Sequence, residues 1–385
     1  MISRAAGAAA SNFNSYWDIP QRVLLLDKHD FPRDKVCGGG ISNKTVGLLA
    51  PHFDISPVIQ QHMTGAFLTY QNQGTVEKAL PGRGGASVLR SEFDFLIVKQ
   101  AIAQGVTFVP KAAFKSAVQS DEEVAVTATT GTYRVKHLVG ADGVFSEVRR
   151  AIFGPDLVTY APAVEALVTV SPDVHERFRG RVLFDFGGMP NGYGWIFPKR
   201  DHLNVGVFSI YKSNEAQIKT MLKSFMGLYR SLDAPLQVIE KGSCIPLRNT
   251  RGLYQRRRVL LVGDAAGFAE SVYGEGIYFA LSSALVAASA IGKGAAAEEV
   301  AGYQEALKSS HLLTDMRYSE LNAGLVFRAP KRSFDLMVRN ESVNHLFAEL
   351  IAGGVGHKEC FFRTLLTSPR WLLFPRRLPP LDVQL

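Results

Sequence analysis

The strongest structural signal in this chain is Val259-Leu260-Leu261-Val262-Gly263-Asp264-Ala265-Ala266-Gly267. Its four apolar residues predict a buried strand of a parallel sheet. The small residues after them let backbone amides approach a ligand, and a helix opening at Gly274-Glu275-Gly276-Ile277 offers unpaired N–H groups to anionic oxygens. A small-residue turn used only for packing is the alternative. Because strand, glycines and helix occur in this order, the segment favours a ligand site in which Asp264 accepts a hydrogen bond from a ribose or ribityl hydroxyl.

Two other strand-like segments also end in an acid. In Leu138-Val139-Gly140-Ala141-Asp142-Gly143, Asp142 is able to hold a hydroxylated cofactor chain, although Asp-Gly turns are common in proteins. The strand Val23–Leu26 ends at Asp27, and in dinucleotide-binding units such an acid receives the ribose hydroxyls of adenosine. A solvated turn residue is the alternative for Asp27. Arg90 opens the next helix and is placed to reach a pyrophosphate, unless it is an ordinary surface arginine.

Composition excludes several classes of protein. With 385 residues, 46% hydrophobic and 20% charged, the chain has the length of two or three folded domains and is not disordered. Three scattered cysteines, and the lack of His-Glu-x-x-His or Cys-x-x-Cys, predict neither a disulfide framework nor a metal site. The net charge of +8 suits an anionic substrate, a phosphate-rich cofactor or an acidic membrane surface.

Nucleic-acid binding and membrane insertion are not expected. The basic run Arg256–Arg258 is typical of a solvated strand entrance, and no aromatic-rich RNA-binding signature accompanies it. The first residues lack a continuous apolar core, so we expect no secretory signal there. The apolar stretch Gly276–Ile291 is shorter than the ~20 residues of a spanning helix, so we expect a buried helix and a cytoplasmic protein.

Taken together, these segments resemble the FAD-binding domain of the para-hydroxybenzoate hydroxylase-like flavoproteins. Three of them resemble the geranylgeranyl reductase family more closely. Phe31-Pro32-Arg33-Asp34-Lys35-Val36-Cys37-Gly38-Gly39-Gly40-Ile41-Ser42 is similar to the signature of that family, Gly192-Tyr193-Gly194-Trp195-Ile196-Phe197-Pro198-Lys199 to its aromatic substrate motif, and Gly263–Ile277 to its second flavin motif. The resemblance covers about residues 20 to 290.

The resemblance implies an α/β fold: a Rossmann-like FAD-binding domain, an inserted antiparallel substrate sheet and a helical C-terminal region. The expected FAD-binding domain comprises residues 1–55, 88–158 and 255–295, the substrate-binding domain residues 56–87 and 159–254, and the helical region residues 296–385.

The implied activity is reduction of carbon–carbon double bonds in a prenyl chain, on a prenylated small molecule or lipid. FAD would deliver the hydride, with electrons from NADPH or ferredoxin. Two alternatives remain open: an aromatic or polyketide monooxygenase on the same scaffold, and a degraded relative that binds flavin poorly. The Cys37 glycine loop and the aromatic run favour the reductase.

The resemblance also assigns roles to residues. The family's flavin contacts carry over to Asp27, Lys35, Gly38, Gly39, Arg90, Asp142, Gly263, Asp264, Gly274, Gly276 and Ile277. Tyr193, Trp195 and Phe197 would share one face of a strand and form an apolar wall beside the flavin, unless they are ordinary core aromatics. Cys37 would steer the proton that the reaction needs, unless it is an inert buried thiol.

Both ends of the chain carry further expectations. The family begins with a strand and Gly-x-Gly-x-x-Gly, whereas Gly7 is the only glycine before Asp27. We therefore expect an N-terminally shortened member that lacks about 10 to 15 residues and binds FAD poorly. At the other end, Trp371–Arg377 combines apolar with basic residues, which suits either peripheral contact with an anionic bilayer or a packed tail.

Overall fold

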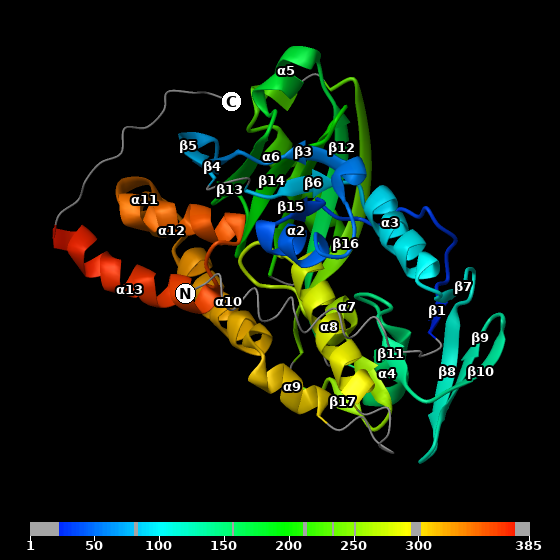
Figure 1. Cartoon of the computed structure of the whole chain (residues 1–385). Coiled ribbons are helices and arrows are strands. Elements are labelled where there is room, and N and C mark those ends of the chain that lie inside the picture. The colour runs from blue at the N-terminus through cyan, green and yellow to red at the C-terminus, as the bar shows by residue number, and fades with distance from the viewer. Residues whose placement is uncertain are drawn as a thin grey trace.

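The computed structural model describes residues 23–80, 84–155, 158–210, 214–232, 235–249, 252–293 and 302–373. Its largest sheet has the strand order β16-β12-β15-β14-β13-β4-β5 (Figure 1). These strands are β4 (Gly65–Tyr70), β5 (Gln73–Ala79), β12 (Val158–Thr169), β13 (Arg181–Phe186), β14 (Gly192–Pro198), β15 (Leu203–Ser209) and β16 (Gln237–Asn249). Neighbours are antiparallel except β13 and β4, which run parallel.

Both faces of this sheet are covered, so its central strands are apolar without strict alternation. Every residue of β15 is buried. Helix α6 (Glu215–Met226) packs on one face, where its Phe225 and Leu222 join the core, and a capping box at Asn214 fixes its start. The opposite face carries Tyr193 and Trp195 and meets the C-terminal helices. Apart from Val158, the first residue of β12, these strands lie inside the two ranges expected for the substrate-binding domain, while the domain division itself stays a prediction.

Two parallel strand pairs form the Rossmann-like part. Strand β1 (Leu24–Leu26) pairs with β7 (Thr107–Val109), and β11 (Leu138–Gly140) pairs with β18 (Val259–Leu261), which also has β17 (Gln255–Arg256) as an antiparallel neighbour. Strand β18 is fully buried, as expected. Strand β1 is only half-buried because β7 is its one hydrogen-bonded neighbour among the described residues, which corrects the prediction of a buried strand.

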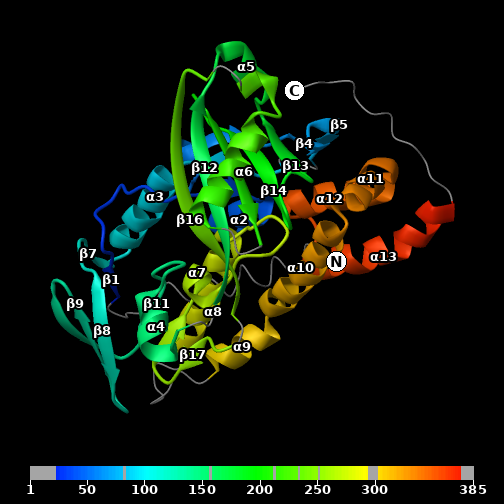
Figure 2. The same cartoon turned by 180° about the vertical axis from the view of Figure 1, so that it is seen from behind.

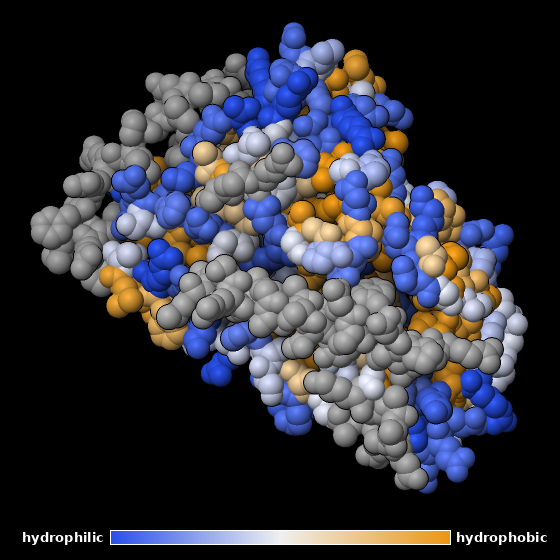
Figure 3. Space-filling view, viewed as in Figure 1, coloured by the Kyte–Doolittle hydropathy of each residue, from blue (hydrophilic) through white to orange (hydrophobic). Residues whose placement is uncertain are grey.

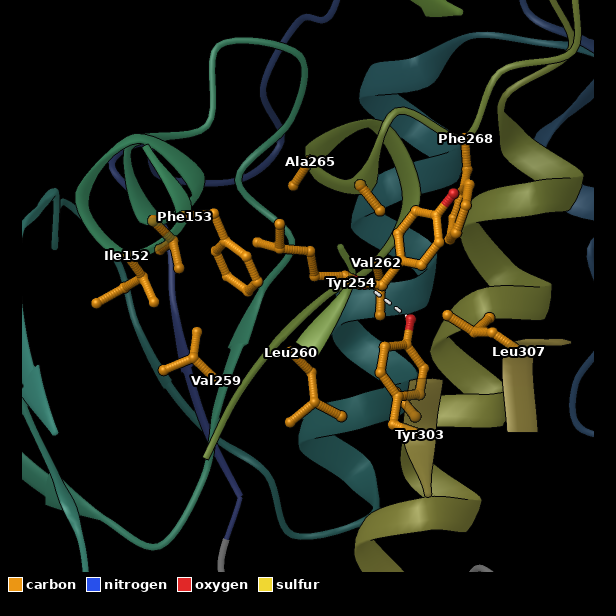
Figure 4. Packing of buried hydrophobic residues seen from close by; sticks show 14 of the residues in the cluster. Ile152, Phe153, Tyr254, Val259, Leu260, Val262, Ala265, Phe268, Tyr303 and Leu307 are labelled. Atoms are coloured by element: carbon orange, nitrogen blue, oxygen red, sulfur yellow. Dashed lines mark hydrogen bonds between the residues drawn. The ribbon is translucent and has the colours of Figure 1, made fainter. Parts of the chain in front are cut away.

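The surroundings of β18 explain why it is buried. Figure 4 shows Val259 and Leu260 between Ile152 and Phe153 of one helix and Tyr303 of another. The Tyr303 hydroxyl donates to the carbonyl of Leu261 over 2.7 Å. The helices of this part are α3 (Arg90–Ala103), α4 (Glu147–Phe153), α7 (Gly263–Ala266), α8 (Ile277–Lys293) and α9 (Tyr303–Ser309). The helices expected after Leu89 and at Ile277 are therefore present.

Smaller elements complete the molecule. One antiparallel sheet has the order β10 (Gly131–Val135), β9 (Val124–Ala128), β8 (Phe114–Gln119), and another has β2 (Gly40–Ile41), β6 (Ala86–Val88), β3 (Ile59–His62). Short helices are α2 (Asn43–Leu49), η2 (Ser56–Val58), α5 (Pro172–Arg177) and η3 (Arg230–Leu232). Strand β6 lies between β2 and β3. Because β2 follows Cys37 directly, its pairing with β6 attaches the Cys37 loop to this sheet.

The C-terminal region is helical, as the sequence predicts. It contains α10 (His311–Arg328), α11 (Pro330–Arg339), α12 (Glu341–Ala352) and α13 (His357–Leu373), and Figure 2 shows α11 and α12 beside the sheet at β13. Among the described helices, none combines the length and apolarity needed to cross a bilayer. The expected N-terminal shortening concerns residues 1–22, which lie outside the described residues.

Candidate active site

A cavity of about 440 Å³ lies where the large sheet meets the loop after β1 and the start of α8. Its lining brings together most of the predicted site residues from distant parts of the sequence. They are Lys35, Cys37, Gly38, Gly39, Arg90, Tyr193, Trp195, Gly263, Asp264, Gly274, Gly276 and Ile277. Asp27 and Asp142 are not among the lining residues, so the structure does not bring these two acids into the cavity.

Asp264 lies directly after β18, in the first turn of α7. Its Oδ2 accepts a hydrogen bond from the Lys35 ammonium over 2.9 Å. A methyl group on Gly276 would come within 3.2 Å of Asp264 Oδ1, and Gly263 has a φ of +54°, which few other residues adopt. The order of strand, small residues and helix therefore brings the backbone at Gly276 close to the Asp264 carboxylate, which the Lys35 side chain also binds.

Asp142 has a local partner instead of facing the cavity. Its carboxylate accepts hydrogen bonds from the Ser146 hydroxyl and from the Val148 amide, the latter at 3.0 Å, at the start of α4. Asp142 is exposed, whereas its neighbours Ala141 and Gly143 line the cavity. Asp142 is thus a turn and helix-start residue, in agreement with the alternative interpretation of this segment as an ordinary Asp-Gly turn.

Arg149 fixes this segment and was not singled out from the sequence. It is 2% exposed, and its guanidinium donates to the carbonyls of Val144 at 2.7 Å and Ala265 at 2.8 Å and to the Tyr160 hydroxyl at 2.7 Å. The residue therefore ties the loop after β11 to α7. Its position three residues after Ser146, an N-cap, was the only available signal.

Asp27, Arg33, Asp94 and Arg90 form a chain of alternating charges. Arg33 lies 3.7 Å from Asp27 and 3.2 Å from Asp94, and Arg90 binds Asp94 through two hydrogen bonds of 2.8 and 2.9 Å. Burial lowers the pKa of Arg90, but Asp94 and the Cys37 thiol outweigh burial and hold that pKa above its ordinary value. Arg33 and Arg90 line the cavity, whereas Asp27 reaches it only through Arg33.

The glycines beside Cys37 are required by packing within the protein. A Cβ on Gly40 would come within 2.6 Å of the Phe197 ring, and one on Gly38 within 3.2 Å of Trp195 Nε1. Gly39 has a φ of +67°, and a Cβ there would overlap the carbonyl oxygen of Val88. The glycine run therefore lets the Cys37 loop lie flat against β14.

Tyr193, Trp195 and Phe197 alternate along β14 and all line the cavity, as their spacing predicts. The Tyr193 hydroxyl donates to the carbonyl of Tyr273 over 2.6 Å. The rings of Tyr193 and Trp195 are 6.1 Å apart, and Trp195 lies over Gly206 of β15, where a Cβ would overlap its ring. These three residues form an aromatic wall.

A buried polar network lies behind this aromatic wall. Trp195 Nε1 donates to Asn204 Oδ1 over 2.8 Å, and the Asn204 amide donates to Glu165 Oε2 over 3.0 Å. Glu165 Oε1 accepts from the backbone N–H of Cys37 over 3.3 Å. Burial raises the pKa of Glu165, while Asn204 and Cys37 act in the opposite direction. The network therefore connects the aromatic wall to the Cys37 loop.

Lys199, the last residue of the aromatic motif, has a role that its sequence position did not indicate. It is 1% exposed, and its ammonium donates to the carbonyls of Gly38 at 2.7 Å and Val88 at 3.1 Å. Burial lowers its pKa to about 8, although Cys37 and Glu165 oppose that shift. Lys199, directly after β14, therefore connects the Cys37 loop to β6 through these two hydrogen bonds, and we call this connection the Lys199 clamp.

A second titratable pair, Glu270 and His357, lies near the other end of the lining and was missed from the sequence. His357 Nε2 is 3.3 Å from Glu270 Oε2, and both side chains are at most 5% exposed. Burial raises the pKa of Glu270 to about 7 and lowers that of His357 to about 3. His357 Nδ1 and the Tyr273 hydroxyl have no hydrogen-bond partner among the described residues, and both residues line the cavity. Because their partners are distant in sequence, no spacing rule identifies them.

The lining suits a large, partly anionic cofactor beside an apolar ligand. Arg33, Lys35 and Arg90 supply cations, while small residues such as Gly143 and Gly263 leave room for close backbone contact. Within the described ranges, no group of three or more His, Cys, Asp or Glu side chains is arranged to hold a metal ion.

Sequence comparisons agree with this arrangement. No family model matches the chain. It is 32% identical over 272 residues to an uncharacterized protein of Methanosarcina barkeri, covering 70% of this chain and 68% of that protein. It is 26% identical over 299 residues to the geranylgeranyl diphosphate reductase of Rhodobacter capsulatus (74% and 73%) and 27% identical over 287 residues to the menaquinone reductase of Mycobacterium tuberculosis (69% of each). Against the chloroplast geranylgeranyl diphosphate reductase of Nicotiana tabacum, the match spans only 35% of that protein.

Solved structures show the same fold. A geranylgeranyl bacteriochlorophyll reductase-like protein from Thermoplasma acidophilum superposes with a TM-score of 0.69 at 18% identity and covers 96% of this chain and 95% of that one. A flavoprotein/dehydrogenase from Cytophaga hutchinsonii gives 0.71 at 15% identity, covering 95% of each. With the FAD-domain motifs meeting at one cavity, these findings place the chain in the geranylgeranyl reductase family of FAD-dependent oxidoreductases.

Proposed function

We propose that this protein reduces carbon–carbon double bonds of a prenyl chain. The observation that supports the proposal most directly is that the aromatic wall and the Cys37 loop packed against it line one cavity, which also reaches the FAD-type motif at Asp264. A prenyl chain has few polar atoms, so its recognition depends on apolar contact, which Tyr193, Trp195 and Phe197 provide. The reductases among the relatives act on geranylgeranyl diphosphate and menaquinone, according to their names.

The residues present fit FAD. Small residues from three segments border one cavity, and cations of the loop after β1 lie beside them. Lys35, Arg33 and Arg90 would hold the pyrophosphate, and Asp264 would accept a hydrogen bond from a hydroxyl of the cofactor. When bound, FAD would supply a hydride to one alkene carbon. NADPH or ferredoxin is the proposed source of its electrons.

Cys37 is the proposed source of the proton for the second alkene carbon. Its sulfur already accepts a hydrogen bond from the Gly39 N–H over 3.3 Å, and Arg90 is close enough to interact with the thiol. These two contacts would orient the sulfur toward the alkene carbon that receives the proton. The bond from Glu165 to the Cys37 backbone and the Lys199 clamp keep the thiol in place.

The direct test is anaerobic reduction of prenyl substrates. The purified enzyme would be reduced with dithionite and mixed with geranylgeranyl diphosphate or a menaquinone, and the products analysed by mass spectrometry for a gain of two hydrogens per double bond. The expected result is loss of double bonds, slowed in Cys37→Ala while the flavin still becomes reduced. NADPH-driven oxygen consumption on an aromatic substrate, with no alkene reduction, would reject the proposal in favour of a monooxygenase.

A further inference from the structure

An exposed apolar surface lies on α10 and α13, away from the aromatic wall. Phe362, Leu365 and Leu366 project from α13 at helical spacing, and Leu366 is 74% exposed. Leu321 and Leu325 of α10 are 43% and 45% exposed. Figure 3 shows hydrophobic residues at the surface over α13, at the lower left. We call these five residues the α10–α13 face.

The two helices form one surface because they pack against each other. The Asn322 amide of α10 donates to the carbonyl of His357 over 2.9 Å, and the Tyr318 ring lies 5.5 Å from Phe361 and 5.6 Å from Phe362. These contacts make the two helices antiparallel, so Leu321, one turn from Tyr318, lies near Phe362, while Leu325 and Leu366 extend the face toward its two ends. Contiguous exposed apolar patches on a folded protein mark interaction sites.

Basic residues border the α10–α13 face. Arg317 and Arg328 of α10 and Lys358 of α13 are exposed, and none of the three forms an ion pair with a described residue. The acid Glu359 is already paired with Arg363 at 3.0 Å, and Asp315 accepts from the backbone of His357 at 2.8 Å. Apolar residues bordered by bases that have no acidic partner in the described part of the chain are the pattern of a helix that lies on an anionic membrane.

We infer that the α10–α13 face is a docking surface for an anionic lipid bilayer. This inference adds a partner to the proposed function, on which it rests for its biological purpose, since a prenyl lipid resides in a membrane. His357, the first residue of α13, lines the cavity, so the docked helix would begin beside the candidate active site. Self-association through the same face would bring like charges of two copies together, whereas anionic headgroups neutralise them.

Vesicle flotation tests the surface without any substrate. The full chain would be mixed with vesicles of phosphatidylglycerol and phosphatidylcholine in equal parts, and with pure phosphatidylcholine vesicles. We expect binding to the anionic vesicles that Leu366→Glu weakens at least about tenfold, since the variant places a charge where apolar contact is made. Lys358→Glu should weaken binding by more than about fivefold, and added salt should weaken it further.

The matched control is Leu236→Glu. Leu236 is 73% exposed, almost the same as Leu366, but lies in the loop before β16, outside the α10–α13 face. Circular dichroism would check that both leucine variants fold. Phe362→Ser is a second variant of the α10–α13 face, and it introduces no charge. Equal loss of binding in both leucine variants would overturn the inference.

Two further outcomes would also overturn it: no flotation of the wild type, or a wild-type dimer in solution that Leu366→Glu converts to a monomer without vesicle binding. Because the flotation assay contains no prenyl substrate, a negative result would reject the docking surface without bearing on the proposed alkene reduction. Conversely, flotation without alkene reduction would reject only the proposed function.

Discussion

Trp195 and Asn204 are joined by a hydrogen bond of 2.8 Å between the indole Nε1 and the amide Oδ1, and both residues are at most 7% exposed. Asn204 also donates to Glu165, which binds the backbone of Cys37. The side-chain amide of Asn204 therefore links the aromatic wall to the Cys37 loop through Glu165, in addition to the hydrogen bond that Lys199 donates to Gly38.

Replacing Asn204 with Leu should lower the free energy of unfolding by about 2 to 4 kcal/mol, because a buried indole N–H and a buried carboxylate each lose a partner. Urea denaturation measures the effect. In the background of Trp195→Phe, where the donor is already gone, the same change should cost about 1 kcal/mol less. Equal costs in both backgrounds would show that the hydrogen bond to Trp195 contributes nothing.

Replacing Trp195 with Ala should reduce kcat/KM for a long prenyl substrate at least about tenfold, since the largest apolar side chain of the wall is removed. FAD should remain bound, because the cofactor motifs lie on other segments. Trp195→Phe preserves an aromatic ring and should retain most of the activity. Unchanged turnover and chain-length preference in Trp195→Ala would make Trp195 a core residue only.

Replacing Asp264 with Ala should weaken FAD retention, because Lys35 loses its partner and a hydroxyl acceptor disappears. The flavin-to-protein absorbance ratio after gel filtration is the readout. Asp142→Ala is the matched control: its carboxylate caps α4, so it should lower stability by about 1 kcal/mol and leave the ratio higher than Asp264→Ala does. Full flavin occupancy in Asp264→Ala would remove that residue from the site.

Replacing Gly39 with Ala should prevent correct folding of the Cys37 loop. The left-handed backbone and the overlap with the Val88 carbonyl together should cost about 2 kcal/mol or more. Gly47→Ala is the comparison, because Gly47 lies inside α2 with open space at its Cβ position, and there alanine should gain about 0.5 to 1 kcal/mol. A thermal melt of both variants distinguishes the two directions; equal Tm values would contradict the assignment.

The Glu270–His357 pair predicts an unusual pH dependence of stability. The pKa of Glu270 is raised in the fold from 4.5 to about 7, so this residue alone lowers stability as pH rises through that range. The pKa of His357 is lowered from 6.5 to about 3, so His357 alone raises stability as pH rises from 3 to 6.5. Between about 4.5 and 6.5 the pair holds one proton in both the folded and the unfolded chain, and the two effects cancel.

Glu270→Gln should expose the contribution of His357. The free energy of unfolding of the Glu270→Gln variant should rise by about 1 to 3 kcal/mol between pH 4.5 and 6.5, relative to the change in the wild type over the same range. His357→Gln should show the opposite slope, a fall as pH rises toward 7. Denaturant titrations at several pH values measure both slopes, and parallel profiles for all three proteins would refute the coupling.

Local patterns predicted the parts of this molecule that depend on neighbours in sequence. The apolar run before Gly263, the helix at Ile277 and the alternation of aromatics along β14 were all visible in short windows. The resemblance, which combined such windows, predicted part of the cavity lining, such as Lys35, Trp195 and Asp264, but not His357. Half-burial of β1 was not visible, since apolar composition reports a preference for burial but not the number of neighbouring strands.

The remaining site residues depend on long-range contacts. Lys199 binds Gly38 and Val88, which are 161 and 111 residues away, and Arg149 binds Ala265 at a separation of 116. Asp142 shows the reverse case: its sequence context suggested a ligand, but nearby donors at Ser146 and Val148 satisfy it. A sequence motif shows which hydrogen-bonding groups are present, but only the folded chain determines which partner each group binds.

The Lys199 clamp has a consequence for cooperativity. One buried ammonium holds carbonyls from the loop after β1 and from β6, while its own backbone follows directly on β14. Melting of the large sheet would withdraw the cation and release the loop, so the two regions should lose structure in one calorimetric transition. A ligand that orders the loop would then raise the melting temperature of the sheet, although it touches only part of it.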